Sequence, residues 1–481
     1  MASVQEQSID TLQADPARWW GMAEVVRFSV PAVLSTASFS IMQFVDRLMV
    51  SMVNPESLSA QSIGGLWSFV PLSLVMGILG CVSTFASQNL GAGRPEKAAL
   101  YGWQGLWLSW IAAAVFAIPI IWARNLFSLF PHEEAVLDLE TRYFQILIGG
   151  AVLALSSNAI TNFFLGIHRP GIPLIAGVAG NAANFVAAYI LIFGKLGCPQ
   201  LGLVGAGVGS LIGSAVQTLV LVLYFVCGRC AREYQVRRQW RLSWPAMLDL
   251  LRIGTPAGAM FMGDVLMWAL FMAYVIGKFG LVALAAGAIL FSYWQFCFMP
   301  AIGVGNAATA IVGRYCGAGR PRLAWHRAHA ALILVELYMV TCGIVMWIFR
   351  EDLVRMFNET GDPAVQVAAT QVFIFLLICQ ACDALSVIFI GALRGAGDTL
   401  WPGAVQLTLA YGLGLGGSIL AAHLFPEWGS LGVWSVASGY IILLGLLMWG
   451  RFLGGKWRGM AVVETPAVPI VTSEAGVLPP A

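Results

Sequence analysis

The chain has 481 residues, of which 59% are hydrophobic and only 10% are charged, and its mean hydropathy is +0.80. Soluble proteins carry about 25% charged and about 45–50% apolar residues, so this composition excludes a soluble globular domain and indicates a membrane protein. The net charge is only +2, which argues against a nucleic-acid-binding surface, and we expect no nucleic-acid partner.

Long stretches with few or no charged residues predict the membrane-spanning helices. A spanning helix needs about 20 predominantly apolar residues. Twelve stretches meet this requirement: 28–54, 57–93, 98–123, 143–168, 170–194, 196–228, 253–277, 279–313, 330–349, 363–393, 399–426 and 428–450. Strands of a membrane barrel are shorter and alternate in polarity, unlike these stretches. The predicted fold class is therefore an all-α polytopic membrane protein with twelve transmembrane helices.

Composition also suggests where the domains begin and end. We expect a polar N-terminal tail at 1–21, which is not a cleavable signal peptide, and a disordered tail at 455–481. A basic linker at 228–249 separates two bundles of six helices, 22–227 and 250–454. Lys and Arg concentrate in the tails and in alternate loops, so the positive-inside rule places both termini in the cytoplasm. We expect a multi-pass protein of the inner (plasma) membrane.

A repeated word links the two bundles. GAGRP occurs at 91–95 and again at 317–321, and Pro31 and Pro256 open corresponding helices 225 positions apart. Further matching landmarks follow in the same order, which indicates a tandem duplication. Six spans per half make the repeats parallel, and parallel repeats build transporters that bind substrate between their halves.

The repeated word itself has a structural explanation. Its glycines can adopt positive φ in a tight turn between helices, and the proline that follows can start the next helix. We therefore expect Gly91, Gly93, Gly317 and Gly319 to shape turns rather than to bind phosphate.

Several motifs together resemble the multidrug and toxic compound extrusion (MATE) family, NorM-like branch. They are FVDRLMV late in the first helix, GAG after helices 2 and 8, and ALRGAGDTLWP after helix 10. The resemblance covers about residues 22–455. It implies export of cationic and amphiphilic small molecules in exchange for H⁺ or Na⁺. It also implies functional carboxylates at Asp46, Asp264 and Asp383.

The chain departs from the family pattern at three places. Asn184 is followed by Ala188 where the family often has a second polar residue, Gly287 begins a Gly-Ala pair in place of His-Gln, and Cys379 replaces a tyrosine. The loss of an aromatic at Cys379 favours H⁺ over Na⁺ as the coupling ion.

The carboxylates also stand out on physical grounds. A charged residue at the centre of a membrane helix costs about 2.5–3.5 kcal/mol on insertion scales, so such groups usually face a cavity or a partner. Phe261, Trp268 and Phe271 share a helical face with Asp264, and a carboxylate beside aromatic rings suits a flat organic cation. The alternative is that the rings pack on lipid while Asp264 bonds a nearby polar residue.

Amides lie three residues before the other two acids. Gln380 precedes Asp383 and Gln43 precedes Asp46, and each amide could orient its carboxylate on the same helical face. Arg47 offers a competing explanation for Asp46, an ion pair at the outer end of the helix.

Other polar residues in the spans have weaker claims. Asn184 could line a cavity in the first half or bond two helices together. For Glu336 we expect a structural role rather than a part in transport. Cys227/Cys230 and Cys379/Cys382 lack further ligands at zinc spacing, so we expect buried thiols, no bound metal and no cofactor beyond the coupling ion.

The sequence therefore predicts an efflux antiporter and not an enzyme, with small cationic or amphiphilic substrates and the lipid bilayer as partners, acting as a monomer. The alternative is a lipid-linked precursor flippase of the same superfamily, which would need several basic residues inside its first-half helices. A membrane-embedded transferase would need paired metal-binding acids or a His/Asp constellation, and neither pattern is present in the sequence.

Overall fold

The structure, a computed structural model, describes residues 21–53, 55–128, 134–357 and 361–463. These residues form helices and connecting turns and contain no strand. Eleven of the helices are long and apolar enough to cross a membrane, and a pair bent by 45° supplies a twelfth crossing. The all-α fold class predicted from the sequence is confirmed.

The first half of the chain contributes six crossings. They are α2 (Met22–Ser51), α3 (Pro55–Gly91), α4 (Pro95–Ala117), the bent pair α6 (Glu134–Gly149) and α7 (Ala151–Gly166), α8 (Gly171–Phe193) and α9 (Leu203–Cys227). Short helices η2 (Ile118–Trp122) and α5 (Ala123–Phe127) follow α4, and α10 (Arg229–Glu233) and η3 (Val236–Arg238) follow α9.

The second half contributes the other six. They are α11 (Trp244–Leu270) continued by η4 (Phe271–Val275) and η5 (Ile276–Phe279), α12 (Leu281–Gly317), α13 (Pro321–Ile348), α15 (Pro363–Ala396), α16 (Leu400–Leu409) continued by η6 (Ala410–Gly417) and α17 (Ser418–Leu424), and α18 (Gly429–Leu453). The remaining short helices are α14 (Arg350–Phe357), η7 (Pro426–Trp428) and η8 (Lys456–Gly459).

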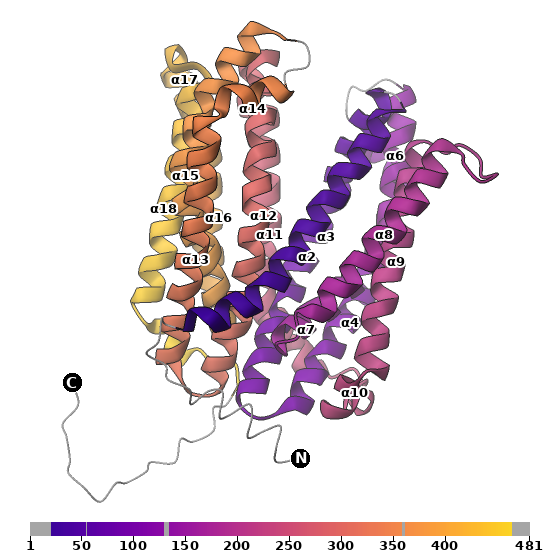
Figure 1. Cartoon of the computed structure of the whole chain (residues 1–481), viewed down its shortest axis with the longest axis vertical. Helices are drawn as coiled ribbons and strands as arrows, with labels where there is room; N and C mark the ends of the chain where they lie inside the picture. Colours follow the sequence, from indigo (N-terminus) through magenta and orange to yellow (C-terminus); the bar gives the residue numbers. More distant parts are fainter. Residues whose placement is uncertain (1–20, 54, 129–133, 358–360, 464–481) are drawn as a thin grey trace, which may run out of the picture.

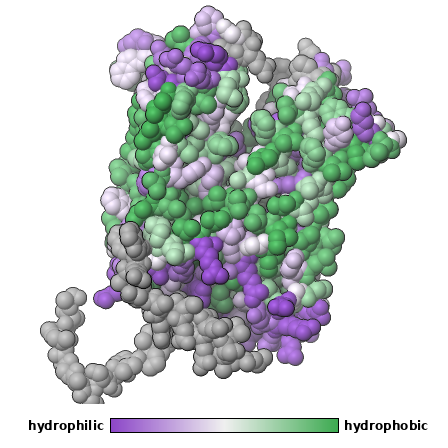
Figure 2. Space-filling view, viewed as in Figure 1, coloured by the Kyte–Doolittle hydropathy of each residue, from purple (hydrophilic) through white to green (hydrophobic). Residues whose placement is uncertain are grey.

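The surface carries a broad apolar belt between two polar ends, as expected for a protein that crosses a bilayer (Figure 2). We call the end at which α2 begins and α18 ends the basal end, and the opposite end the distal end. The two halves stand side by side, joined at the basal end and splayed toward the distal end (Figure 1). Figure 2 shows a depression between the two distal lobes.

The repeated glycines bring the halves together at the basal end. Gly91 of α3 lies against the backbone of Arg314 in α12, and Gly317 of α12 lies against the backbone of Gln88 in α3, so neither position has room for a side chain. Gly93 and Gly319 take the turn, with φ of 72° and 70°. The prediction of turn glycines is confirmed for Gly93 and Gly319. Gly91 and Gly317 instead allow the two helices to approach each other closely.

Helix α2 belongs to both halves. Its basal part packs with the core of the second half through Val25, Phe28 and Ala32, while Met49 and Val50 near its distal end pack with α8 and α9 of the first half. Pro31 lies inside this helix. An internal proline removes a backbone hydrogen bond and bends a helix, which suits a segment that crosses between two bundles.

Polar side chains close the basal end. Arg327 Nε donates to Glu24 Oε2 over 2.7 Å, and Tyr315 OH donates to the same oxygen over 2.9 Å, so α2 is tied to α12 and α13. Gln88 Nε2 donates to Gly395 O over 2.8 Å, across the same interface. Hydrogen bonds to charged groups contribute about 1.5–3 kcal/mol, so these contacts stabilise the closed basal end.

The first residues of the C-terminal tail are ordered, which corrects the prediction that the chain is disordered from residue 455. Trp457 in η8 is fully buried and stacks on Phe452 with ring centroids 4.6 Å apart, and Val462 N donates to Gln88 Oε1 over 2.8 Å. Burial of the indole offsets the entropy of ordering this segment. The rest of that tail, 464–481, and residues 1–20 of the N-terminal tail lie outside the described residues.

Candidate functional site

Two of the predicted carboxylates share one site inside the second half. Asp264 of α11 accepts hydrogen bonds at Oδ1 from Gln406 Nε2 over 3.2 Å and from Tyr440 OH over 3.4 Å. Asp383 of α15 accepts one at Oδ2 from Trp294 Nε1 over 2.8 Å. Trp294 also contacts Trp268, which lies one turn beyond Asp264, so both acids belong to one polar and aromatic cluster. A proton or a cation bound there would neutralise their negative charge.

Aromatic side chains connect the two acids. Trp268, one turn beyond Asp264 on α11, meets Trp294 edge to face with centroids 5.6 Å apart, and it meets Phe291 in the same way at 5.3 Å. Trp294 in turn holds Asp383. The site therefore combines negative charge with ring surfaces, which is the combination that attracts organic cations.

A second, smaller site lies in the first half, nearer the distal end. Asn184 Nδ2 of α8 donates to Asp46 Oδ2 of α2 and to Ser210 Oγ of α9, each over 3.3 Å. Asp46 Oδ1 and Asn184 Oδ1 are buried and have no hydrogen-bond donor among the described residues. Two unpartnered oxygens from different helices can accept a proton or act as hard oxygen ligands to a small cation.

Neither site contains a permanent positive charge. In the described part of the chain, no Lys or Arg forms an ion pair with Asp46, Asp264 or Asp383. Arg47, which could have paired with Asp46, is exposed. The negative charge of these acids is therefore available to a mobile ion.

The amides expected to orient the acids do not do so. Gln43 is exposed, so Asp46 takes its partner from α8 instead. Gln380 is buried, but neither polar atom of its side chain has a hydrogen-bond partner among the described residues. The side chain of Gln380 instead lies close to Gly343 of α13. If Gly343 carried a Cβ, that atom would be 3.4 Å from Gln380 Cγ. Spacing along one helix places side chains on one face but cannot show which neighbouring helix they meet.

The three aromatics predicted around Asp264 do not all share the same surroundings. Trp268 contacts Trp294, the residue that holds Asp383, and it also meets Phe271 edge to face with centroids 5.6 Å apart. Phe261 is 37% exposed and touches Phe69 of the first half, with centroids 5.9 Å apart. Phe271 is fully buried against Trp434, with centroids 5.1 Å apart, so it belongs to the core of the second half.

Sequence reasoning missed the donors that hold the two acids of the second half. Trp294, Gln406 and Tyr440 come from helices α12, α16 and α18. It also missed Ser210 of α9, whose hydroxyl accepts a hydrogen bond from Asn184. A glutamine inside an otherwise apolar span was a usable signal for Gln406, because a buried amide needs a partner. Nothing in the sequence distinguishes Trp294 and Tyr440 from the many other aromatics of the spans.

A buried guanidinium was also missed. Arg394 of α15 donates to Asn306 Oδ1 over 2.9 Å and to Thr309 Oγ1 over 3.1 Å, and it approaches Gly80 of the first half. No carboxylate among the described residues pairs with it. Because Arg394 reaches Gly80 of the first half, its positive charge lies at the contact between the halves.

The remaining candidates stay outside these sites. Glu336 of α13 is half-buried and lies near Cys382. Cys379 and Cys382 are free thiols, and Cys379 forms a side-chain hydrogen bond with Ser438. Glu336 and the two thiols therefore occupy the packing between α13, α15 and α18.

Such an architecture, two six-helix halves with internal carboxylates, defines a membrane transporter built from parallel repeats. The MatE family model matches the chain twice, over residues 31–190 and 259–420. The chain belongs to the MatE family, whose members are transporters.

Named relatives cover most of the chain. The probable multidrug resistance protein NorM of Mesorhizobium japonicum is 27% identical over 429 residues, which are 87% of this chain and 91% of the relative. The multidrug resistance protein NorM of Burkholderia vietnamiensis is 27% identical over 448 residues, with 91% and 95% coverage.

Solved structures share the fold. A multidrug resistance MATE family transporter in an outward-facing conformation superposes with a TM-score of 0.82 at 18% identity, covering 90% of this chain and 96% of that one. A eukaryotic MATE transporter superposes with a TM-score of 0.83 at 18% identity, covering 92% and 98%.

Proposed function

We propose that this chain is a secondary-active multidrug efflux antiporter that exports cationic or amphiphilic small molecules in exchange for H⁺ or Na⁺. It acts as a monomer in the inner membrane, with the basal end and both termini in the cytoplasm. The names of its relatives support multidrug export. The concentration of Arg at the basal linker supports the orientation.

One observation carries the proposal: Asp264 and Asp383 lie inside one bundle, connected through Trp268 and Trp294, with only neutral donors around them. Negative charge on these two carboxylates is unfavourable in a low-dielectric interior unless a cation neutralises it. A coupling ion and an organic cation can both neutralise it, but two cations at one site would repel each other. Competition of this kind makes exchange, rather than co-transport, the expected reaction.

The conformation fits one stage of such a cycle. With the distal ends apart, the coupling ion enters from outside, occupies the carboxylates and displaces substrate outward. The loaded protein then closes its distal end and opens its basal end, which requires the Glu24–Arg327 pair to separate. Release of the ion to the cytoplasm leaves the acids free to attract the next substrate.

The decisive experiment uses purified full-length protein in vesicles loaded with a cationic dye. Dye movement is followed under an imposed pH gradient and, separately, under an imposed Na⁺ gradient. We expect movement driven by the pH gradient, and movement driven only by Na⁺ would reassign the coupling ion. Dye movement that ignores both gradients would exclude an antiporter.

A matched pair of variants completes the design. Asp264→Asn removes the charge inside the bundle, whereas Asp249→Asn removes an exposed acid near the basal end of the same helix. Gradient-driven transport should be lost in the first variant and kept in the second. Equal transport by both variants would contradict the proposal.

A further inference from the structure

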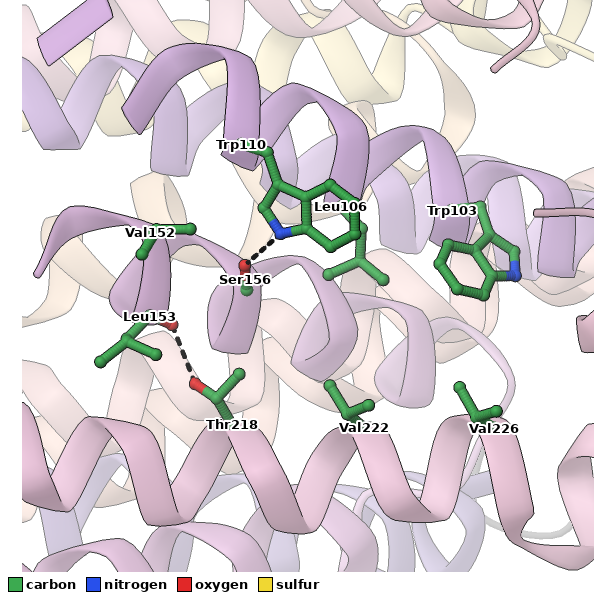
Figure 3. Close-up of a pocket in the computed structure, with 9 residues that line it drawn as sticks. All are labelled: Trp103, Leu106, Trp110, Val152, Leu153, Ser156, Thr218, Val222 and Val226. Carbon is green, nitrogen blue, oxygen red and sulfur yellow. Dashed lines mark hydrogen bonds between the residues drawn. The ribbon is translucent and has the colours of Figure 1, made fainter. Parts of the chain in front are cut away.

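A groove in the first half is separate from the carboxylate sites. It lies between α4, α7 and α9 and has a volume of about 260 Å³ (Figure 3). Trp103, Leu106 and Trp110 of α4 form one wall, and Thr218, Val222 and Val226 of α9 form the opposite wall.

The groove is lined almost wholly by apolar surface. Its polar atoms are used within the walls, because Trp110 Nε1 donates to Ser156 Oγ over 3.2 Å and Thr218 Oγ1 donates to Leu153 O over 3.0 Å. Thr218, Val222 and Val226 follow each other at intervals of four residues, so the groove runs for about 12 Å along α9. A narrow groove without free hydrogen-bonding groups suits a hydrocarbon chain.

The basal end of the groove leads to a basic segment. Arg237 Nε donates to Val226 O over 2.9 Å, directly where the groove ends. Trp103 Nε1 donates to Val236 O over 2.9 Å, and Gln104 Nε2 donates to Arg241 O over 3.2 Å. The linker is thus fastened to α4. The exposed side chain of Arg237 lies at the end of the groove, and exposed Arg241 is held through its carbonyl by Gln104, the neighbour of Trp103 in the sequence.

We propose that this groove binds one acyl chain of an anionic phospholipid, whose phosphate is held by Arg237 and Arg241. The apolar walls and the adjacent guanidinium groups together match a molecule with a hydrocarbon chain and an anionic head. A cationic drug would be repelled by the same arginines, and a peptide would find no hydrogen-bond partners in the walls. The site does not depend on the antiport mechanism proposed above.

Native mass spectrometry of the detergent-solubilised full chain tests the head-group contacts. With phosphatidylglycerol and phosphatidylcholine of equal chain length, we expect one phosphatidylglycerol to be retained in preference. The double variant Arg237→Gln/Arg241→Gln should lower its retention roughly tenfold or more, since each basic side chain contributes about 1 kcal/mol to attraction of anionic lipid. The control Arg320→Gln/Arg322→Gln removes two exposed arginines from the basal end of the second half and should change nothing.

A second pair of variants tests the acyl groove. Val222→Phe fills the groove, whereas Leu223→Phe adds the same ring at the adjacent position, which is 51% exposed. Only the first should lose the lipid while keeping the elution volume of the folded protein. Equal retention of the two lipids, unchanged retention in both Arg237→Gln/Arg241→Gln and Val222→Phe, or equal losses in the control variants would overturn the proposal.

Discussion

The two halves of the molecule share a scaffold to the level of single turns. Pro31 and Pro256 lie inside the first crossing of each half, and Pro71 and Pro300 lie inside the second. The glycines of the repeated word meet across the interface in reciprocal fashion.

One ion pair is preserved in place but reversed in sign. After the fourth crossing of the first half, Arg169 pairs with Glu233 over 2.6 Å, and after the fourth crossing of the second half, Asp398 pairs with Arg451 over 2.8 Å. Each pair ties the turn to the segment at the basal end of the sixth crossing. The geometry of the repeat is therefore kept by different residues.

The acids do not follow the repeat. Shifted by the 225 positions that separate Pro31 from Pro256, Asp264 corresponds to Phe39 and Asp46 corresponds to Phe271. The second half holds two acids in one site, whereas the first half holds one acid with an amide and a hydroxyl. The repeat therefore accounts for the internal prolines and the glycine interface, whereas the buried acids differ in number and in partners between the halves.

The largest effect is expected from the second half. Asp264→Asn or Asp383→Asn should each lower gradient-driven dye transport at least about a hundredfold, because removal of one charge from a buried pair alters its ion affinity by more than about 2.7 kcal/mol. Initial rates in vesicles under a pH gradient provide the measurement. Each variant must elute as the folded protein in detergent, and a folded variant with full transport would place the coupling site elsewhere.

A smaller effect is expected from the first half. Asp46→Asn should lower the same rate by about tenfold, because the second-half pair stays intact and a single hydrogen-bonded charge contributes about 1.5–3 kcal/mol. Asn184→Ala should produce a comparable loss, while Asn181→Ala, on the same helix and bonded to Ser38 instead, should not. If Asp46→Asn matched Asp383→Asn in severity, the two halves would be equal partners in coupling.

The sequence predicted the spans and the duplication because both depend on local patterns. Hydropathy and charge are carried by each stretch of about 20 residues, and twelve crossings were recovered in the structure. The three acids could be singled out as candidates for the same reason, since a charge inside an apolar span is visible without any knowledge of packing.

The partners of the acids could not be predicted. Asp383 is held by Trp294, which is 89 positions away, and Asp264 is held by Gln406, 142 positions away. Proximity along a helix suggested Gln380 and Gln43 instead. Which helices face each other is decided by packing between small residues such as Gly77 and Gly258, and the contact is a property of the folded bundle.

A third prediction concerns the interface that both halves share. A Cβ at Gly77 would lie 2.6 Å from Gly258 Cα, so Gly77→Ala must push α3 and α11 apart at the basal side. We expect a few-fold change in transport rate, because overpacking costs about 1–3 kcal/mol and acts on both conformations unequally. Gly149→Ala adds the same methyl where no neighbour lies within 4 Å and serves as the control.

Initial rates of dye transport measure the change in transport. The labelling rate of buried Cys316 by an impermeant maleimide in everted vesicles, with the other cysteines replaced, measures opening of the basal end. Faster labelling of Gly77→Ala than of Gly149→Ala would show a loosened basal end. Identical rates would mean that the interface absorbs the methyl group without opening.

The smallest effect on transport is expected from the turn after the fourth crossing, where the two halves have different residues at one position. His168 occupies the position of Gly397, and both have positive φ, 61° and 98°. Burial, followed by the charge of nearby Arg314, lowers the pKa of His168 from 6.5 to about 3. Because the unfolded chain takes up a proton that the folded chain refuses, stability is complete above pH 6.5 and declines as pH falls toward 3.

Replacement by the residue of the other half should remove this sensitivity. The native chain should lose about 2 kcal/mol of stability between pH 7 and pH 5 through this group, whereas His168→Gly should lose none of it and should transport normally at pH 7. Thermal unfolding in detergent at the two pH values measures the difference, with His423→Gln, an exposed histidine, as the control. Because glycine accepts positive φ without strain, an equal acid loss in His168→Gly would mean that another group, and not this turn, senses pH.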